Sequence, residues 1–206
     1  MARAGRASAV AEAREQMYRS LVLSAAERVF GERGYHAARM QEVAREAGIS
    51  LQTLYSTFPS KREVFDALHE ERGAEFLAEV SAALSGEGDA RAALRRGVAA
   101  FVSYLVEHPD YFRVDLREGR SWAIGDVEAS PAFQAGIENW TSLMRRGINE
   151  GIFYDEDPDV MAATAFGLMQ VQLAAWMARP TPPEAEALTE RIATQLERAF
   201  CRPVAD

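Results

Sequence analysis

The chain has 206 residues, of which 48% are hydrophobic and three are tryptophan. This apolar content excludes an intrinsically disordered chain and is enough for one large core or two small ones. The formal net charge of −8 also argues against a protein that is basic throughout.

The charge is unevenly distributed along the sequence. Residues 1–61 carry nine Lys and Arg against six Asp and Glu, so basic side chains predominate only in this part. The remainder of the chain is acidic. This asymmetry favours a small basic segment that binds nucleic acid, attached to an acidic body.

The N-terminal segment and the cysteine content indicate in which cellular compartment the protein is expected. Residues 1–13 are expected to be a disordered tail, in which Arg3 and Arg6 are either solvated or contact DNA. Glu12 interrupts any apolar run, so no signal peptide is expected. Cys201 is the only cysteine, which excludes an intrachain disulfide and fits a cytoplasmic protein.

A first long helix is predicted from about Glu15 to Arg33, where Gly34 ends it. Two short helices follow, at residues 39–47 and 51–58. The first of them has an apolar stripe at helical spacing, made of Met40, Val43, Ala44 and Ala47.

A tight turn joins the two short helices. Gly48 supplies the positive φ that ends the first, Ser50 can cap the second, and Pro59 prevents its continuation. The pattern is typical of a helix-turn-helix whose second helix presents uncharged hydrogen-bonding side chains to the DNA major groove. A helical hairpin inside an all-α core would show the same polar face.

Five stretches make the first alternative more specific: Ala25-Ala26-Glu27-Arg28-Val29-Phe30, Arg33-Gly34-Tyr35, Val43-Ala44-Arg45-Glu46-Ala47-Gly48-Ile49-Ser50, Thr53-Leu54-Tyr55 and Phe58-Pro59-Ser60-Lys61-Arg62-Glu63. In this order and spacing, residues 20–68 resemble the N-terminal domain of TetR-family regulators. The resemblance implies a homodimer that binds a palindromic operator and usually represses transcription. It also implies a small molecule that enters the body, moves a connector helix and so changes the spacing of the two DNA-binding domains.

The resemblance implies DNA contacts position by position. Thr53 and Tyr55 match the family's Thr-Leu-Tyr and are expected to touch phosphate and sugar, and Lys61 matches its phosphate-binding lysine. The other contact positions hold residues that are not typical of the family: Arg39, Gln41, Gln52, Ser56 and Thr57. Ala38 also stands where the family usually has a threonine cap. These departures leave the operator sequence unpredicted.

Ser60 and Glu63 form a predicted capping box that opens a long helix, Lys61 to about Leu84. Gly73 in its middle is a candidate bend point, because glycine lowers helix propensity by about 1 kcal/mol relative to alanine. Residues 85–89 are predicted to form a linker. The predicted domains are therefore a tail at 1–13, a helix-turn-helix domain at 14–60, a connector helix at 61–84 and an effector-binding and dimerisation domain at 85–206.

The body is predicted to contain about five helices, which makes the whole protein all-α. One stretch, Val160 to Ala178, has nineteen residues without a charge and is a transmembrane candidate by length. Thr164, Gln170 and Gln172 lie within it, and no second such segment exists. A helix in the interior or at a subunit interface is therefore favoured.

Aromatic and methionine side chains of the body are candidates for a site that binds a lipophilic effector, although such residues are more often core. The candidates are Phe101, Tyr104, Leu105, Phe112, Trp122, Trp140, Met144, Phe166 and Met169. The resemblance implies that the last two helices of each subunit pair in a four-helix bundle. The stripe at 188, 192, 196 and 200 supports this because it needs a partner. The expected interface residues are Leu173, Trp176, Leu188, Ile192 and Leu196.

No enzyme site is recognisable. His36, His69 and His108 fall in three different elements, and Cys201 lies near an end that is expected to fray. No catalytic residue, metal site or cofactor is therefore expected. Two alternatives stay open: a DNA-binding activator or architectural protein without a ligand, and a helical carrier or enzyme that has lost DNA binding.

Overall fold

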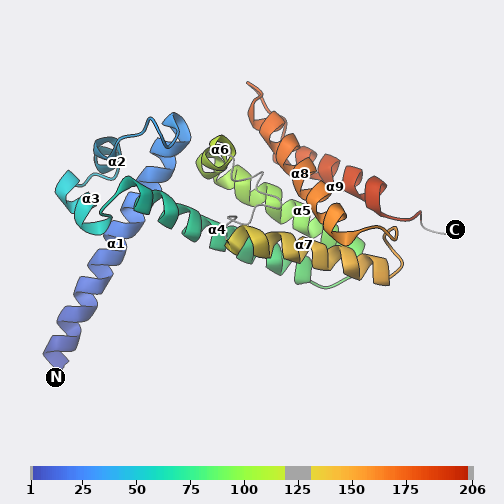
Figure 1. The fold of residues 1–206 in the computed structure, drawn as a ribbon, viewed down its shortest axis with the longest axis horizontal. Coiled ribbons are helices and arrows are strands. Elements are labelled where there is room, and N and C mark those ends of the chain that lie inside the picture. The colour runs from blue at the N-terminus through green and yellow to red at the C-terminus, as the bar shows by residue number, and fades with distance from the viewer. Residues whose placement is uncertain (1, 119–130, 204–206) are drawn as a thin grey trace. The chain divides into compact units, whose positions relative to one another are not determined.

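The computed structural model describes residues 2–118 and 131–203, with side chains from residue 10 onward except at residue 11. Within these residues the only regular elements are α-helices, which confirms the all-α fold class (Figure 1). The helices are α1 (Ala2–Arg33), α2 (Met40–Glu46), α3 (Leu51–Thr57), α4 (Lys61–Ser85), α5 (Ala90–Glu107), α6 (Pro109–Arg117), α7 (Pro131–Asn149), α8 (Pro158–Met177) and α9 (Ala185–Phe200).

The chain divides into two compact units. Unit 1 consists of Met1–Arg72 and Pro109–Glu118, and unit 2 consists of Gly73–His108 and the chain from Gly119 onward. The division passes through α4 at Gly73, the candidate bend point, and not through the linker after residue 84. It also places α6, which was expected in the body, with the helix-turn-helix.

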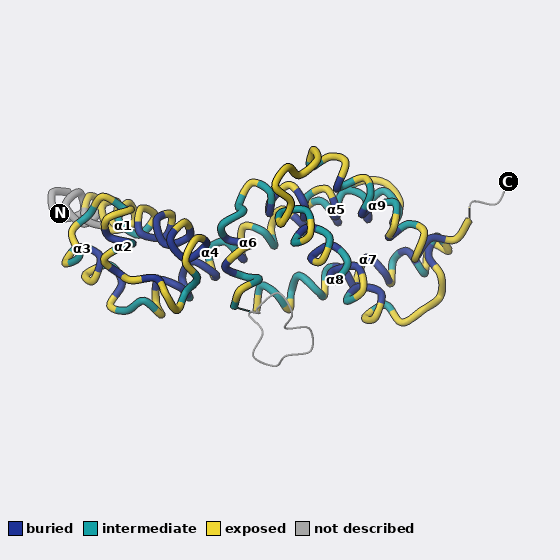
Figure 2. Tube along the Cα trace, turned by 90° about the horizontal axis from the view of Figure 1, so that it is seen from above, coloured by how far each residue is buried: buried dark blue, intermediate teal, exposed yellow. Residues whose placement is uncertain are grey.

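Helix α1 begins at Ala2, so the segment expected to be a disordered tail is helical in this structure. Alanine, arginine and glutamate make up most of that segment, and these residues have the highest helix propensities. The side chains of residues 12–17 are exposed, so local propensity and not packing supports this part of the helix (Figure 2). The side chains of Arg3 and Arg6 lie outside the described residues.

The core of unit 1 holds α2 and α3 against α1 and the first turns of α4. Its centre contains side chains with no exposed surface: Val22, Phe30, Val43, Leu54 and Val64. The Tyr35 ring packs against Phe30 and Phe65, with centroid distances of 5.8 and 4.5 Å. The helix-turn-helix is therefore supported by a packed hydrophobic core.

Helix α6 packs against the C-terminal end of α1. A Cβ atom at Gly31 would lie 2.7 Å from Cβ and 2.9 Å from Cα of Asp110, so this approach requires glycine. Arg117 Nη1 donates to the carbonyls of Gly31 at 2.8 Å and Glu32 at 3.1 Å. These bonds satisfy acceptors that the end of a helix leaves open. They explain why α6 belongs to unit 1.

In unit 2, the apolar face of α9 is covered by α5 and α8 of the same chain. Leu188, Ile192 and Leu196 have an exposed fraction of 0%. Leu173 on α8 is equally buried, and Trp176 donates its Nε1 proton to the Pro183 carbonyl at 2.8 Å. The stripe is therefore covered within its own chain, where amphipathic α9 completes the core of unit 2.

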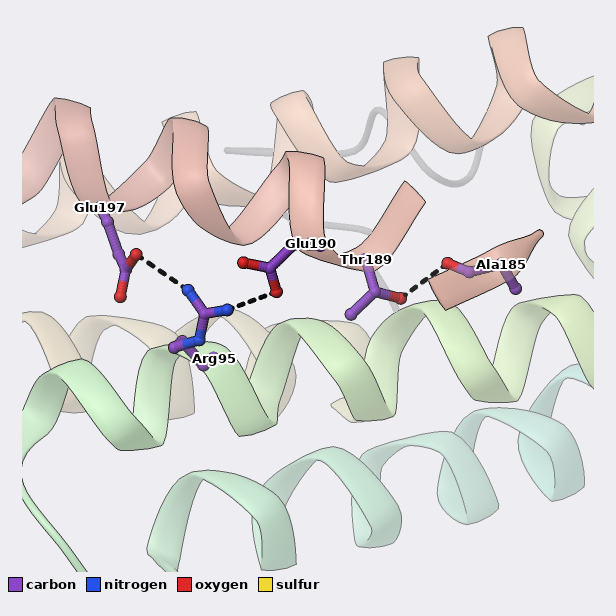
Figure 3. A network of polar contacts seen from close by, with 5 residues as sticks. All are labelled: Arg95, Ala185, Thr189, Glu190 and Glu197. Atoms are coloured by element: carbon purple, nitrogen blue, oxygen red, sulfur yellow. Dashed lines mark hydrogen bonds and ion pairs between the residues drawn. The ribbon is translucent and has the colours of Figure 1, made fainter. Parts of the chain in front are cut away.

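Arg95 on α5 connects to two carboxylates on α9 (Figure 3). It forms ion pairs with Glu190 and, at 2.9 Å, with Glu197. The hydrogen bond to Glu190 raises the pKa of Arg95. Because these groups are partly exposed, the pairs contribute little to stability. They do fix the register of α9 along α5, since the two carboxylates stand two turns apart on one face.

The end of α9 is held in place and does not fray. Tyr154 N donates to the Phe200 carbonyl and Arg202 N to the Ile152 carbonyl, both at 2.8 Å. Cys201 is consequently buried, and burial raises the pKa of its thiol. The Phe153 ring leaves no space beside Gly147. A Cβ atom at Gly147 would lie 2.1 Å from Phe153 Cδ2.

By length and composition, α8 could cross a membrane. Its buried residues, which include Met161, Ala165 and Met169, pack within unit 2, chiefly against α7 and α9. Its composition is thus accounted for by a core helix. One further stripe of α8 remains exposed, with Val160 at 60% and Val171 at 54%.

Candidate DNA-binding surface and effector site

The turn between α2 and α3 has the predicted geometry. Gly48 adopts a φ of 67°, and the following Ile49 N donates to the Ala44 carbonyl at 3.1 Å. Ser50 Oγ accepts a hydrogen bond from Thr53 N at 3.0 Å, which caps α3. These bonds fix the angle between the two helices and confirm the helix-turn-helix.

The start of α2 is capped without the usual threonine. Arg39 is the N-cap residue, and its backbone N–H donates to Glu42 Oε2 at 3.0 Å. Glu42 also forms an ion pair with Arg33 at 3.2 Å. The carboxylate of Glu42 thus takes over part of the capping, and it leaves the side chains of Arg39 and Gln41 exposed.

Helix α3 presents Gln52, Tyr55 and Ser56 to solvent, while Thr53 and Thr57 are half-buried. Leu54 and Phe58 point into the core of unit 1. The exposed fraction of Tyr55 is 44%, which is large for an aromatic side chain. The predicted contact residues of α3 are therefore brought to one accessible face or its edge.

Internal hydrogen bonds limit what these side chains can offer to DNA. Ser56 Oγ and Thr57 Oγ1 donate to the Thr53 carbonyl at 2.8 and 3.0 Å. Thr53 Oγ1 lies 2.8 Å from Ser50 Oγ. While these bonds persist, Ser56 and Thr57 can act only as acceptors. Gln52 carries both a donor and an acceptor group, which suits it best to base recognition.

Lys61 lies in surroundings that the sequence did not indicate. Its Nζ is 2.8 Å from the carbonyl oxygen of Tyr35, 3.3 Å from that of His36 and 3.1 Å from that of Ala38. It is also 4.5 Å from the centroid of the Tyr35 ring. The side chain is half-buried. This environment differs from that of a lysine directed at a phosphate.

Most candidate effector residues are buried together in unit 2, but two are not part of that group. The buried ones are Phe101, Tyr104, Leu105, Trp140, Met144, Phe166 and Met169. Phe112 belongs to unit 1, because α6 packs on α1. Trp122 lies outside the described residues.

Aromatic rings connect four helices of unit 2. Phe101 on α5 lies 5.3 Å from Phe76 on α4 and 5.8 Å from Phe166 on α8, between ring centroids. Phe133 on α7 lies 5.3 Å from Phe166. Phe76 and Phe133 were not among the predicted effector residues. The helical spacing of Phe76 with Val80 and of Phe133 with Ile137 is the sequence signal that could have identified them.

Unit 2 also contains two buried residues with polar side chains, Tyr104 and Gln170. Tyr104 Oη donates to Glu75 Oε2 at 3.1 Å. Gln170 on α8 is 2% exposed, and its Oε1 has no hydrogen-bond partner among the described residues. A buried acceptor left in this state is unfavourable. The described residues contain no cluster of His, Cys, Asp or Glu that could hold a metal ion.

Comparison with known proteins assigns both parts of the chain. Residues 22–68 match the model of bacterial regulatory proteins, tetR family, and residues 91–199 match the model of the tetracyclin repressor-like C-terminal domain.

Individual relatives agree with these matches. The HTH-type transcriptional activator FasR of Mycolicibacterium smegmatis is 41% identical over 96 residues, which is 47% of this chain and 44% of that protein. The fatty acid degradation regulator FadR of Bacillus halodurans has a similar fold, with a TM-score of 0.76 and 21% identity over 86% of this chain and 93% of that one. The ketosteroid transcriptional regulator of Mycobacterium tuberculosis gives a TM-score of 0.75 and 21% identity, covering 90% and 95%.

Proposed function

Since the chain belongs to the TetR family of bacterial transcription regulators, we propose that it binds a palindromic operator as a homodimer and releases it when a small lipophilic molecule binds unit 2. The protein is a DNA-binding regulator and not an enzyme. The observation that carries the proposal is the helix-turn-helix. It exposes Gln52 and Tyr55 to solvent on a helix that is held by a packed hydrophobic core.

The DNA contacts follow from the chemistry of the exposed side chains. Gln52 can bind adenine in the major groove through the N–H and the C=O of its side-chain amide. Thr53 and Tyr55 stand where sugar and phosphate contacts are expected. The remaining proposed contacts come from the start of α2 and the end of α3, namely Arg39, Gln41, Ser56 and Thr57. The two hydroxyls would accept hydrogen bonds from base amino groups, because their protons are used within α3.

Replacing Gln52 with alanine is expected to weaken binding to the preferred operator by about 1–3 kcal/mol and to relax preference at one base pair. Binding to unrelated DNA should stay unchanged, because the phosphate contacts remain. Competition binding with operator variants, each changed at one position, measures both quantities. Equal weakening on operator and unrelated DNA would contradict a role for Gln52 in reading a base.

The exposed stripe of α8 supports dimerisation through residues other than those of the α9 stripe. Val160, Thr164, Val171 and Ala175 are all exposed and recur at helical spacing with Gly167 between them. Small side chains let a second helix approach closely. The proposed interface is therefore this outer face of α8 and not the buried stripe of α9.

A lipophilic effector is supported by the side chains of unit 2. Phe101, Phe133 and Phe166 offer aromatic surface, and Gln170 Oε1 offers one buried acceptor. We therefore favour an apolar molecule that carries a hydrogen-bond donor. Similar folds occur in regulators of fatty acid degradation and of ketosteroids, which are apolar compounds.

Effector binding and operator binding are expected to weaken each other by the same factor, because the two equilibria are linked. Tryptophan fluorescence and DNA release test this when they are measured with a panel of long-chain alcohols and hydroxysteroids, whose hydroxyl groups can donate a hydrogen bond. Gln170→Met should leave the stability of the unit unchanged or higher, since it removes an unsatisfied acceptor. It should weaken the response to a donor-bearing effector by about tenfold, the loss expected for one buried hydrogen bond. A compound that binds without releasing DNA is not the effector.

Activation of transcription is a second candidate function, favoured by the activator FasR as a relative. Transcription in vitro from the operator-bearing promoter distinguishes an activator from a repressor. A rise in transcript upon addition of the protein indicates an activator, and a fall indicates a repressor.

A further inference from the structure

Lys61 occupies the first position of α4, where a cation is electrostatically disfavoured by the helix dipole. Its ammonium group nevertheless lies within hydrogen-bond distance of three backbone carbonyls, those of Tyr35, His36 and Ala38. An ammonium group has three N–H donors, so the number of donors matches the number of acceptors. The Tyr35 ring adds a cation–π contact at 4.5 Å.

These three carbonyls belong to the loop that joins α1 to α2. The loop has few backbone bonds of its own, among them Ala38 N to the Gly34 carbonyl at 3.2 Å. Its last residue before α2 is Arg39, the N-cap. Any displacement of Ala38 would therefore move the start of α2 and, through the tight turn at Gly48, also α3.

The geometry points to Lys61 as a positioning residue that fixes the α1–α2 loop and thereby the orientation of the helix-turn-helix, and not as a ligand of a DNA phosphate. A phosphate contact would require Nζ to give up at least one carbonyl, since all its donors are engaged. The next residue shows the contrast: Arg62 is exposed and pairs only locally, with Asp66 at 2.7 Å. This inference rests on DNA binding as the function of unit 1.

Lys61→Arg and Lys61→Met separate the two roles. Arginine keeps the charge but spreads its donors over a planar group, so it cannot reproduce three bonds from one nitrogen. If Lys61 positions the loop, both variants should lose about tenfold or more in operator affinity, because the loop carbonyls, two of them in part-buried bonds, lose their donors. If Lys61 binds phosphate, Lys61→Arg should bind as the wild type does.

The salt dependence of binding gives a readout that a positioning role does not change. Each phosphate contact contributes about 0.9 to the slope of log affinity against log salt concentration. We expect the slope of Lys61→Met to equal that of the wild type, whereas Arg39→Met, the control at an exposed cation, should lower it. A slope lowered by about one in Lys61→Met, with wild-type affinity in Lys61→Arg, would overturn the inference.

Hydrogen exchange in the DNA-free protein tests the inference even if operator binding cannot be found. The amides of Ala38 and Arg39 should exchange faster in Lys61→Arg than in the wild type. Amides of unit 2, such as Phe153, should not change. Failure of both variants to fold would also support a structural role for these bonds, whereas unchanged exchange at Ala38 would overturn it.

Discussion

Replacing Leu196 with aspartate should unfold unit 2, with a loss of stability of about 4–5 kcal/mol or more. Leu196 has no exposed surface, and α5 and α8 of the same chain cover the face on which it lies. A carboxylate introduced there must be desolvated or protonated, and either change costs free energy. Urea denaturation followed by circular dichroism measures the loss.

Val171→Asp is the contrasting variant. Its position is 54% exposed on α8, so the carboxylate remains in water in the single chain and the fold should persist. Light scattering should then report monomers, because a charge has been placed in the proposed subunit interface. A folded, monomeric Leu196→Asp protein would instead restore α9 as the pairing surface.

Gly147→Ala is expected to lower the free energy of unfolding by about 3 kcal/mol, at the upper end of the range for overpacking a core. The new Cβ atom would lie 2.1 Å from Cδ2 and 2.4 Å from Cε2 of Phe153. That ring is fully buried, and the Gly147 carbonyl accepts the Phe153 backbone N–H at 3.0 Å, so neither group can move away freely.

Gly136→Ala in the same helix provides the matched control. The nearest atom to a Cβ at Gly136 is Leu77 Cδ1, at 4.0 Å. Alanine should therefore stabilise α7 by about 0.5–1 kcal/mol through helix propensity alone. Thermal melting of both variants checks the difference. Equal effects of the two substitutions would show that the Phe153 ring is not held as described.

The sequence was most informative where local chemistry alone determines the structure. Gly48, Ser50 and Pro59 set the ends of α2 and α3, because a positive φ, a hydroxyl cap and a missing N–H act within a few residues. The helix-turn-helix and the exposed positions of Gln52 and Tyr55 could be predicted for this reason. Periodicity likewise located the helices of unit 2.

Features that depend on distant contacts could not be predicted in this way. The stripe at Leu188, Ile192 and Leu196 shows that one face of α9 is covered, but a stripe does not specify whether the cover is α5 or a second subunit. The bonds of Lys61 join residues more than twenty positions apart. The assignment of α6 depends on Gly31, a glycine inside a helix whose small size matters only when Asp110 lies against it.

The placement of α6 has a consequence for synthesis of the protein. Unit 1 is discontinuous in sequence, because its last helix, Pro109–Arg117, follows the first 36 residues of unit 2, Gly73–His108. On the ribosome the helix-turn-helix emerges early, yet the face of α1 around Gly31 stays uncovered until α6 has left the exit tunnel. A nascent chain that stops at residue 72 would therefore expose this face, and a truncated DNA-binding fragment will need residues 109–118, supplied in cis or as a peptide, to fold completely.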